Sequence, residues 1–214
     1  KFSLKIIELA KENIPDLEVI VLTIKPSGAE NEKALLGKPL SNFFKIRSIV
    51  KTCDLVHALD GFPFGVIAAM ATLGTNARFV ITAVGSGAIQ PFNHPLYSRL
   101  LKWAYKKAAQ VIAVSTYTAE QIKNKIPELD IKVINHGVDF AQYQISEKET
   151  TPEEIIVKKP YILSVGMVKK RKGYHISLRA FAQAVKQVPE LNYIIVGLPL
   201  DKAYFGELKK LVKD

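Results

Sequence analysis

A run of basic residues that ends in a glycine is the part of this 214-residue sequence whose chemistry is easiest to read. Residues 164–173 read Ser-Val-Gly-Met-Val-Lys-Lys-Arg-Lys-Gly, and they follow a predicted strand and precede a predicted helix. Gly166 allows a tight turn, the basic run supplies charge, and the helix N-terminus adds amide donors and the positive end of its dipole. This combination suits a diphosphate. Spacing alone leaves two other interpretations open, a solvated loop at Lys169 to Lys172 and a patch for nucleic acid or nuclear localisation.

Further candidate residues follow two predicted strands in the first half of the chain. His57 lies at the end of one strand and Asp60 just after it, while Gly85 and Ser86 belong to a turn of small residues after the other. Ligands of parallel α/β sheets bind beyond the carboxyl ends of the strands, so these positions are expected to face a binding cleft. The turn lacks the G-x-G-x-x-G spacing of a dinucleotide site, which argues against a nicotinamide cofactor. A structural role for His57 and a plain turn at Gly85 stay open, and no triad or carboxylate pair identifies a catalytic residue.

The candidate residues depend on strands and helices that alternate along the chain. Apolar runs predict strands over residues 17–23, 54–58, 78–82, 111–114, 131–134, 161–165 and 193–196. Helical periodicity predicts helices over residues 4–11, 40–51, 65–73, 96–109, 119–125 and 174–188, and a last one from about Tyr204. Ser115 or Thr116 is expected to cap the helix that carries residues 119–125, with Glu120 in its first turn. This alternation predicts an α/β protein with parallel sheets covered on both faces.

A polar and acidic stretch divides the alternating pattern in two. Residues 140–159 contain four glutamates around Pro152 and lack clear periodicity up to Glu154, so they are predicted to be a linker. Residues 1–139 are predicted to form one Rossmann-like domain, whose first strand is expected to precede the chain. Residues 160–214 are predicted to form only the start of a second domain.

The composition of the chain indicates which classes of partner and which cellular compartment to expect. Thirty Lys and Arg residues against twenty Asp and Glu residues give a formal net charge of +10, which favours anionic partners such as nucleotides, nucleic acid or acidic lipid headgroups. The longest apolar runs fall far short of the roughly 20 residues that cross a bilayer, and residues 1–10 do not resemble a signal peptide. The single cysteine, Cys53, cannot form an internal disulfide, which favours a reducing, cytoplasmic setting.

Five segments, taken in order, are similar to the large glycosyltransferase family 4, also called group 1 glycosyltransferases. They are Asp54 to Asp60, Phe79 to Ser86, Val111 to Ser115, Val133 to Asp139 and Ile162 to Gly173. One such segment is a weak signal, but five in register cover the chain from about residue 15 to its end. The resemblance implies a GT-B fold with two Rossmann-like, doubly wound domains, the first mainly binding the acceptor and the second the nucleotide sugar. Both domains are expected to be incomplete in this chain.

The resemblance also implies an activity and roles for the candidate residues. Family members usually transfer a sugar from a nucleotide sugar to a glycan, lipid or small-molecule acceptor, with retention of configuration and without a metal or other cofactor. The family's Lys-Gly pair falls within the basic run, and the expected donor residues are Gly166, Lys170, Arg171, Lys172 and Gly173. Asp60, Gly85 and Ser86 are expected to line the acceptor side. The expected setting is the cytoplasm, with peripheral contact to acidic lipid at the inner face of the membrane and no nucleic-acid partner.

Two departures from the family pattern leave a rival function open. Val84 stands where the family often has a histidine that contacts donor or acceptor. Met167 stands where an arginine commonly shares the diphosphate with the lysine, and Lys170 or Arg171 is the hypothetical substitute. The rival is a noncatalytic family member that binds a nucleotide or nucleic acid through its basic cleft. The Glu-x7-Glu motif that holds the nucleotide sugar is expected beyond Asp214, so the chain by itself is expected to be inactive.

Overall fold

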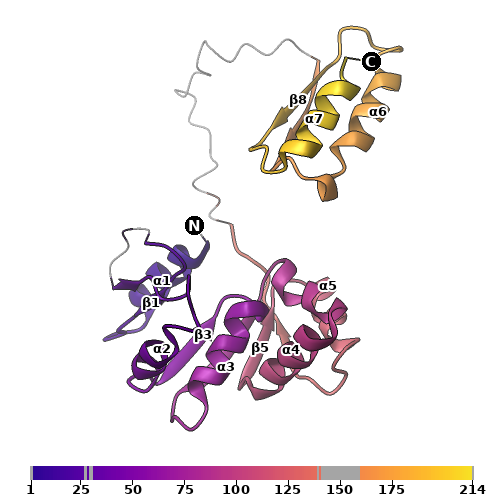
Figure 1. Ribbon diagram of the computed structural model, residues 1–214. Helices are drawn as coiled ribbons and strands as arrows, with labels where there is room; N and C mark the ends of the chain where they lie inside the picture. Colours follow the sequence, from indigo (N-terminus) through magenta and orange to yellow (C-terminus); the bar gives the residue numbers. More distant parts are fainter. Residues whose placement is uncertain (1, 27, 29–30, 139, 141–159, 214) are drawn as a thin grey trace. The chain divides into compact units, whose positions relative to one another are not determined.

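Every strand pair in the described chain is parallel, as the alternation of strands and helices predicts. The computed structural model describes residues 2–26, 28, 31–138, 140 and 160–213 (Figure 1). The chain divides into two units, Lys1–Asp139 (the N-unit) and Phe140–Asp214 (the C-unit), and each is described by itself. Apart from Phe140, the predicted linker at residues 140–159 lies outside the described residues.

The N-unit is built around a four-stranded sheet in the order β3–β4–β5–β6. Its strands are β3 (Leu55–Ala58), β4 (Arg78–Ala83), β5 (Gln110–Ala113) and β6 (Ile131–Val133). A separate pair consists of β1 (Val21–Leu22) and β2 (Glu32–Lys33). β1 is much shorter than the strand predicted over residues 17–23, and β2 was not predicted, because two residues carry no periodicity.

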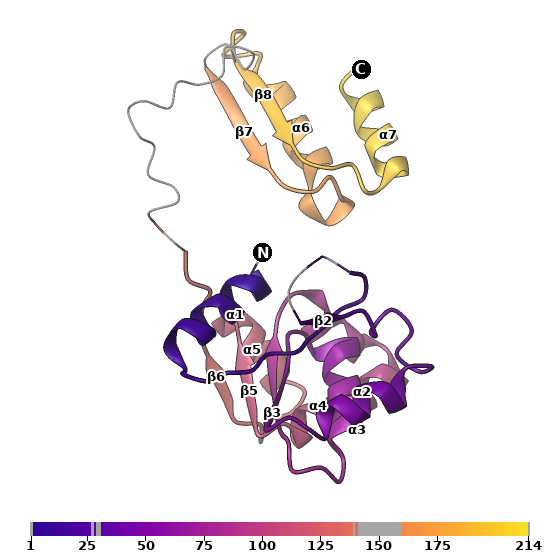
Figure 2. The same ribbon diagram turned by 90° about the vertical axis from the view of Figure 1, so that its left-hand side faces the viewer.

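The helices of the N-unit are α1 (Phe2–Asn13), α2 (Phe43–Val50), α3 (Val66–Thr72), α4 (Pro95–Lys107) and α5 (Thr116–Lys123). The helices from α2 to α5 contribute to the cores on one face of this sheet, and α2, α3 and α4 lie on the same side of β3 (Figure 2). Ile81 of β4 and Leu101 and Tyr105 of α4 are fully buried in the core between them. On the other face of the sheet Thr82 is buried, Val80 is half-buried and Leu55 is exposed.

The cap of α5 was predicted correctly, but the position of its carboxylate was not. Ser115 is the N-cap, and its Oγ accepts a hydrogen bond from the amide of Thr118 at 3.1 Å. The prediction that Glu120 lies in the first turn is wrong, because α5 begins at Thr116 and Glu120 is its fifth residue. Glu120 is therefore too far along the helix to face its N-terminal amides.

The C-unit pairs two strands and packs two helices side by side (Figures 1 and 2). The elements are β7 (Tyr161–Val165), α6 (Tyr174–Ala184), β8 (Asn192–Val196) and α7 (Lys202–Leu211). β7 has the predicted bounds, whereas α6 ends at Ala184 rather than at Val188. Val168, Tyr174, Tyr204 and Leu208 form a small core. The strands stay open to water, since Leu163 and Val165 are 51% and 74% exposed.

Gly206 lies inside α7, where alanine is expected to be more favourable. A Cβ at this position would meet no heavy atom within 4 Å, so the substitution adds no clash. Gly206→Ala is expected to raise the stability of α7 by roughly 0.5–1 kcal/mol, because the unfolded chain loses conformational freedom. Native-state hydrogen exchange of the α7 amides measures this change. Faster exchange in the variant would contradict it.

Candidate functional site

The basic run forms one tight turn directly after β7. Lys170–Lys172 make a 3-10 turn, η5, in which the amide of Gly173 donates to the carbonyl of Lys170 at 3.0 Å. Gly173 is the N-cap of α6 and has a φ of 73°, a left-handed conformation that favours glycine. Gly173 thus joins the basic turn directly to the helix. All three basic side chains of η5 are exposed.

Gly166, Lys172 and Tyr174 lie together at the carboxyl end of β7. The hydroxyl of Tyr174 donates to the carbonyl of Gly166 at 2.9 Å. A Cβ at Gly166 would lie 3.2 Å from Tyr174 Oη and 4.0 Å from Lys172 Cε, so the Lys172 side chain passes close to this glycine. The fold therefore brings together two of the predicted donor residues, Gly166 and Lys172.

Gly197, which sequence reasoning missed, packs against the same loop. It follows β8 as Gly166 follows β7, and the amide of Gly166 donates to the carbonyl of Val196 at 2.8 Å. A Cβ at Gly197 would overlap the carbonyl of Gly166. The signal that identified Gly166, a glycine directly after a strand, also marks Gly197.

The N-terminus of α6 offers fewer free amide donors than the sequence predicts. The amide of His175 donates to the hydroxyl of Tyr204 at 3.0 Å. The next two amides, of Ile176 and Ser177, donate to the carbonyl of Gly173 at 2.8 and 3.1 Å. A phosphate bound here therefore depends mainly on lysine side chains and on the helix dipole.

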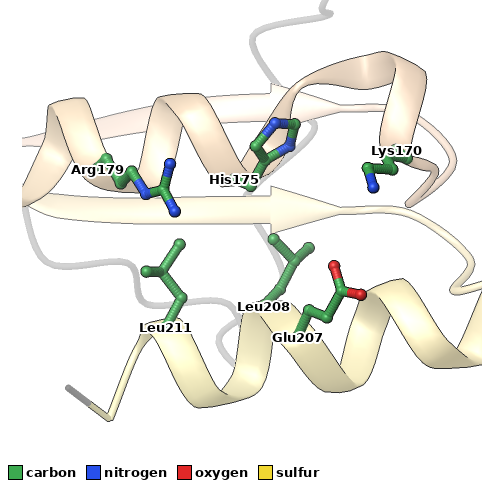
Figure 3. A pocket seen from close by; sticks show the side chains of 6 residues that line it. All are labelled: Lys170, His175, Arg179, Glu207, Leu208 and Leu211. Atoms are coloured by element: carbon green, nitrogen blue, oxygen red, sulfur yellow. The ribbon is translucent and has the colours of Figure 1, made fainter.

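The side chain of Lys170 lines a pocket between α6 and α7 (Figure 3), whereas Lys172 does not line it. Its volume is about 460 Å³, and it is lined by Lys170, His175, Arg179, Glu207, Leu208 and Leu211. Figure 3 shows Lys170, His175 and Arg179 in a row, with the three α7 side chains opposite them. Lys172 and Arg171 do not line this pocket. The fold thus divides the basic run, with Lys170 in the pocket and Lys172 beside Gly166.

In the N-unit, Asp60 lies against the turn of small residues that follows β4. Its carboxylate caps the short helical turn η1 (Gly61–Gly65), accepting a hydrogen bond from the amide of Gly61 at 2.7 Å. A Cβ at Gly87 would overlap this carboxylate, so glycine is needed where the turn η2 (Ser86–Ala88) meets Asp60. Gly85, with a φ of 66°, precedes η2, and Gly85 and Ser86 are exposed. The fold thus brings Asp60 to the Gly85-Ser86 turn.

Burial makes Asp60 an unusual carboxyl group. Desolvation raises its pKa to about 6 and outweighs the hydrogen bonds from the amides of Gly61 and Phe62, which lower it. Tyr105, which the sequence did not single out, lies close by and donates its hydroxyl proton to the carbonyl of Ala88 at 3.0 Å. Burial raises the pKa of Tyr105 far above its ordinary value, and the negative charge of Asp60 raises it further by a smaller amount. Asp60 therefore titrates near neutral pH beside a tyrosine that stays protonated.

This raised pKa predicts how the stability of the N-unit depends on pH. The folded state holds the Asp60 proton more tightly, so the group's contribution to stability is full below the unfolded value of 3.8 and is lost as the pH rises through about 6. Asp60→Asn keeps an acceptor for the Gly61 amide but cannot ionise. The variant is expected to melt above the unsubstituted protein at pH 7 and together with it below pH 4, in thermal unfolding at both values. An identical shift at both pH values would contradict this explanation.

His57 makes a structural hydrogen bond. Its Nε2 lies 2.7 Å from Oγ1 of the buried Thr82 on the neighbouring strand, and burial lowers the pKa of His57. No contact joins His57 to Asp60 among the interactions described for either residue. This geometry agrees with the structural interpretation of His57 that the sequence left open.

Two units, each with parallel strands and with loops that follow the strand ends, are the arrangement expected of a GT-B fold. Crystal structures of HepE from Anabaena are similar to this chain. The complex with UDP and glucose has a TM-score of 0.66 at 21% identity, covering 96% of this chain and 55% of that chain. The complex with UDP-glucose has a TM-score of 0.65 at 21% identity, covering 98% and 55%. These likenesses confirm the GT-B fold.

The family follows from the sequence models. The model of Glycosyltransferase Family 4 matches residues 8–142, and that of Glycosyl transferases group 1 matches residues 146–214. The chain belongs to glycosyltransferase family 4, which confirms the family that its five segments indicate. Spore coat protein SA of Bacillus subtilis (strain 168) is 29% identical over 117 residues, 49% of this chain and 30% of that protein. The chain thus spans about half the length of HepE, and its match to spore coat protein SA covers 30% of that protein.

None of the helices in the described residues is both long enough and apolar enough to cross a membrane. In the same residues no group of three His, Cys, Asp or Glu side chains could hold a metal ion. Metal independence remains a prediction.

Proposed function

We propose that this chain carries the donor diphosphate site and the acceptor side of a glycosyltransferase that uses a nucleotide sugar. The observation that supports this most is Lys172 beside Gly166, at the carboxyl end of β7 in a member of family 4. The similar HepE structures are complexes with UDP, with UDP and glucose and with UDP-glucose. A UDP-hexose is therefore the first donor to test.

In the proposed reaction, the bond between the anomeric carbon and the diphosphate breaks, and an acceptor hydroxyl bonds to that carbon with retention of configuration. The hydroxyl proton goes to the leaving nucleoside diphosphate. Lys172 stabilises the negative charge that develops on the diphosphate, a role that a metal ion serves elsewhere. The proposal needs no metal and no cofactor besides the donor.

On the acceptor side, Asp60 and the exposed Gly85-Ser86 turn are proposed to receive the hydroxyl-bearing group. A carboxylate accepts hydrogen bonds from hydroxyl groups, and the small turn lets an acceptor approach the backbone. Peripheral contact with acidic lipid and a cytoplasmic setting also belong to this proposal. The net charge of +10 supports the lipid contact.

Nucleotide release tests the proposal. The whole protein that contains this chain is incubated with UDP-, GDP- and ADP-sugars in the presence of EDTA and a panel of glycoside and lipid acceptors. Release of nucleoside diphosphate from one donor is expected, with a product whose anomeric configuration by NMR equals that of the donor. If no nucleoside diphosphate is released from any common sugar nucleotide, the proposal is wrong.

A noncatalytic protein that binds a nucleotide through the basic turn is the second candidate. Val84 and Met167 favour it, because neither side chain can make the hydrogen bonds of the residues usual in the family. Binding that falls steeply with salt and ignores the sugar of the donor would support this candidate.

A further inference from the structure

The peptide bond between Gly166 and Met167 is held in place at its carbonyl end. The carbonyl of Gly166 accepts a hydrogen bond from the hydroxyl of Tyr174 at 2.9 Å. A Cβ at Gly197 would overlap this carbonyl oxygen, whereas it would lie 3.3 Å from the amide nitrogen of Met167. Among the described residues, no acceptor receives a hydrogen bond from that amide. The amide of Met167 is thus an unused donor in the loop that follows β7.

This amide points away from β8. The amide of Gly166 donates to the carbonyl of Val196 at 2.8 Å. Two residues on, the amide of Val168 donates to the carbonyl of Leu198 at 3.0 Å. Successive amides of an extended chain point to opposite edges, and the amide of a trans peptide points opposite to its carbonyl. The amide of Met167 therefore faces the edge of β7 that lies opposite β8.

That edge is where a doubly wound sheet binds its ligand. In such a sheet the crevice lies beyond the carboxyl end of the first strand, on the side away from the second strand. β7 and β8 are the first two strands described in the C-unit. The unused amide of Met167 and the expected crevice are therefore on the same side of β7.

Tyr174 is a firm support for this peptide bond. It is the first residue of α6, it is 4% exposed, and its ring belongs to the small core of the C-unit. A Cβ at Gly166 would lie 3.2 Å from Tyr174 Oη and 4.0 Å from Lys172 Cε. The hydroxyl that holds the peptide and the side chain of Lys172 therefore lie beside the same glycine.

An anionic oxygen is the acceptor that such an amide and a nearby lysine share best. Met167 stands where the family commonly has an arginine, so its side chain supplies no donor there. We propose that Tyr174 is a positioning residue, whose hydroxyl orients the Gly166–Met167 peptide so that the Met167 amide donates to an oxygen of the donor diphosphate. This inference rests on the proposed function. The backbone amide then supplies a donor at the position where the arginine side chain is absent.

Titration of the whole protein that contains this chain with UDP tests the inference. Tyr174→Phe keeps the buried ring and removes only the hydroxyl. The variant is expected to bind UDP about tenfold more weakly, because one hydrogen bond to a charged oxygen loses its geometry. Tyr193→Phe is the matched control. It also removes a hydroxyl from the C-unit, but one that bonds to Ser164 and Ser177 and not to the loop, so UDP affinity should stay unchanged.

NMR of protein labelled with ¹⁵N-methionine observes the proposed donor directly. The amide resonance of Met167 is assigned by its loss in Met167→Leu. Its proton is expected to shift downfield when UDP binds, because a hydrogen bond to a charged oxygen is short and strong. In Tyr174→Phe this shift is expected to be smaller. A merely structural role for Tyr174 would lower the melting temperature of the variant and leave this shift the same.

The inference is wrong if the folded Tyr174→Phe variant binds UDP as tightly as the unsubstituted protein, or if Tyr193→Phe loses as much affinity. It is also wrong if UDP binds and leaves the Met167 amide resonance unmoved. Circular dichroism shows whether each variant is folded. These results would contradict only the roles of Tyr174 and Met167. If the unsubstituted protein binds neither UDP nor GDP nor ADP, the proposed function itself is wrong.

Discussion

Lys172→Ala is expected to lower kcat/KM for the nucleotide sugar by about 100- to 1000-fold in the whole protein that contains this chain. The leaving diphosphate gains negative charge in the transition state, and a positioned cation that stabilises this charge contributes roughly 3–4 kcal/mol. The Lys172 side chain passes close to Gly166 at the carboxyl end of β7, where such a diphosphate is proposed to bind. Initial rates of nucleotide release at several donor concentrations measure the change.

Lys170→Ala is the matched control for this prediction. Lys170 belongs to the same 3-10 turn and is also exposed, but its side chain lines the pocket between α6 and α7. Its loss is expected to change kcat/KM by less than about threefold, because an exposed charge at a distance is screened by water and salt. A loss confined to Lys170→Ala would overturn the assignment of Lys172. Equal losses in both variants would mean that the turn acts through its total charge.

Gly197→Ala is expected to destabilise the C-unit by roughly 1–3 kcal/mol, because the clash with the backbone of the neighbouring loop can be relieved only by moving that backbone. The new methyl group would overlap the carbonyl of Gly166, which also accepts the hydrogen bond from Tyr174. Moving Gly166 shifts the loop beside which Lys172 lies, so affinity for UDP is expected to fall as well. Hydrogen exchange of the β7 and β8 amides and a UDP titration measure the two effects.

Gly206→Ala is the matched control in the same unit, because its methyl group meets no heavy atom within 4 Å and the expected sign is the opposite. The two glycines differ in what surrounds them rather than in the substitution made. If Gly197→Ala left both hydrogen exchange and UDP affinity unchanged, the close contact between the loops after β7 and β8 would not matter for folding or for binding.

Local patterns predicted the regular elements of this fold well. The strand over 161–165 has the predicted bounds, because an apolar run bounded by Pro160 and Gly166 leaves little choice. Ser115 caps α5 as expected. This cap was predictable because its hydrogen bond joins two residues only three positions apart in the sequence, Ser115 and Thr118. β2 escaped prediction, because its two residues become a strand only through pairing with β1.

The candidate site was predictable only in part. The rule that ligands bind beyond strand ends identified Gly166 and the basic run, and the family's Lys-Gly pair identified Lys172. The fold brings Gly166 and Lys172 together. The same rule cannot tell which way a side chain turns, so it did not separate Lys170 from Lys172. Nor could it find the contact between the rings of Tyr97 and Phe62, because these residues are 35 positions apart and meet only through the packing of α4 on η1.

The open strands of the C-unit have a consequence for handling this chain by itself. β7 and β8 pair only with each other among the described residues, so each presents an outer edge of backbone donors and acceptors. The segment Tyr161–Val165 carries neither charge nor proline, which is the composition of strands that stack across molecules. Concentrated solutions of this chain are therefore expected to lose material to edge-to-edge aggregation while each molecule is still folded.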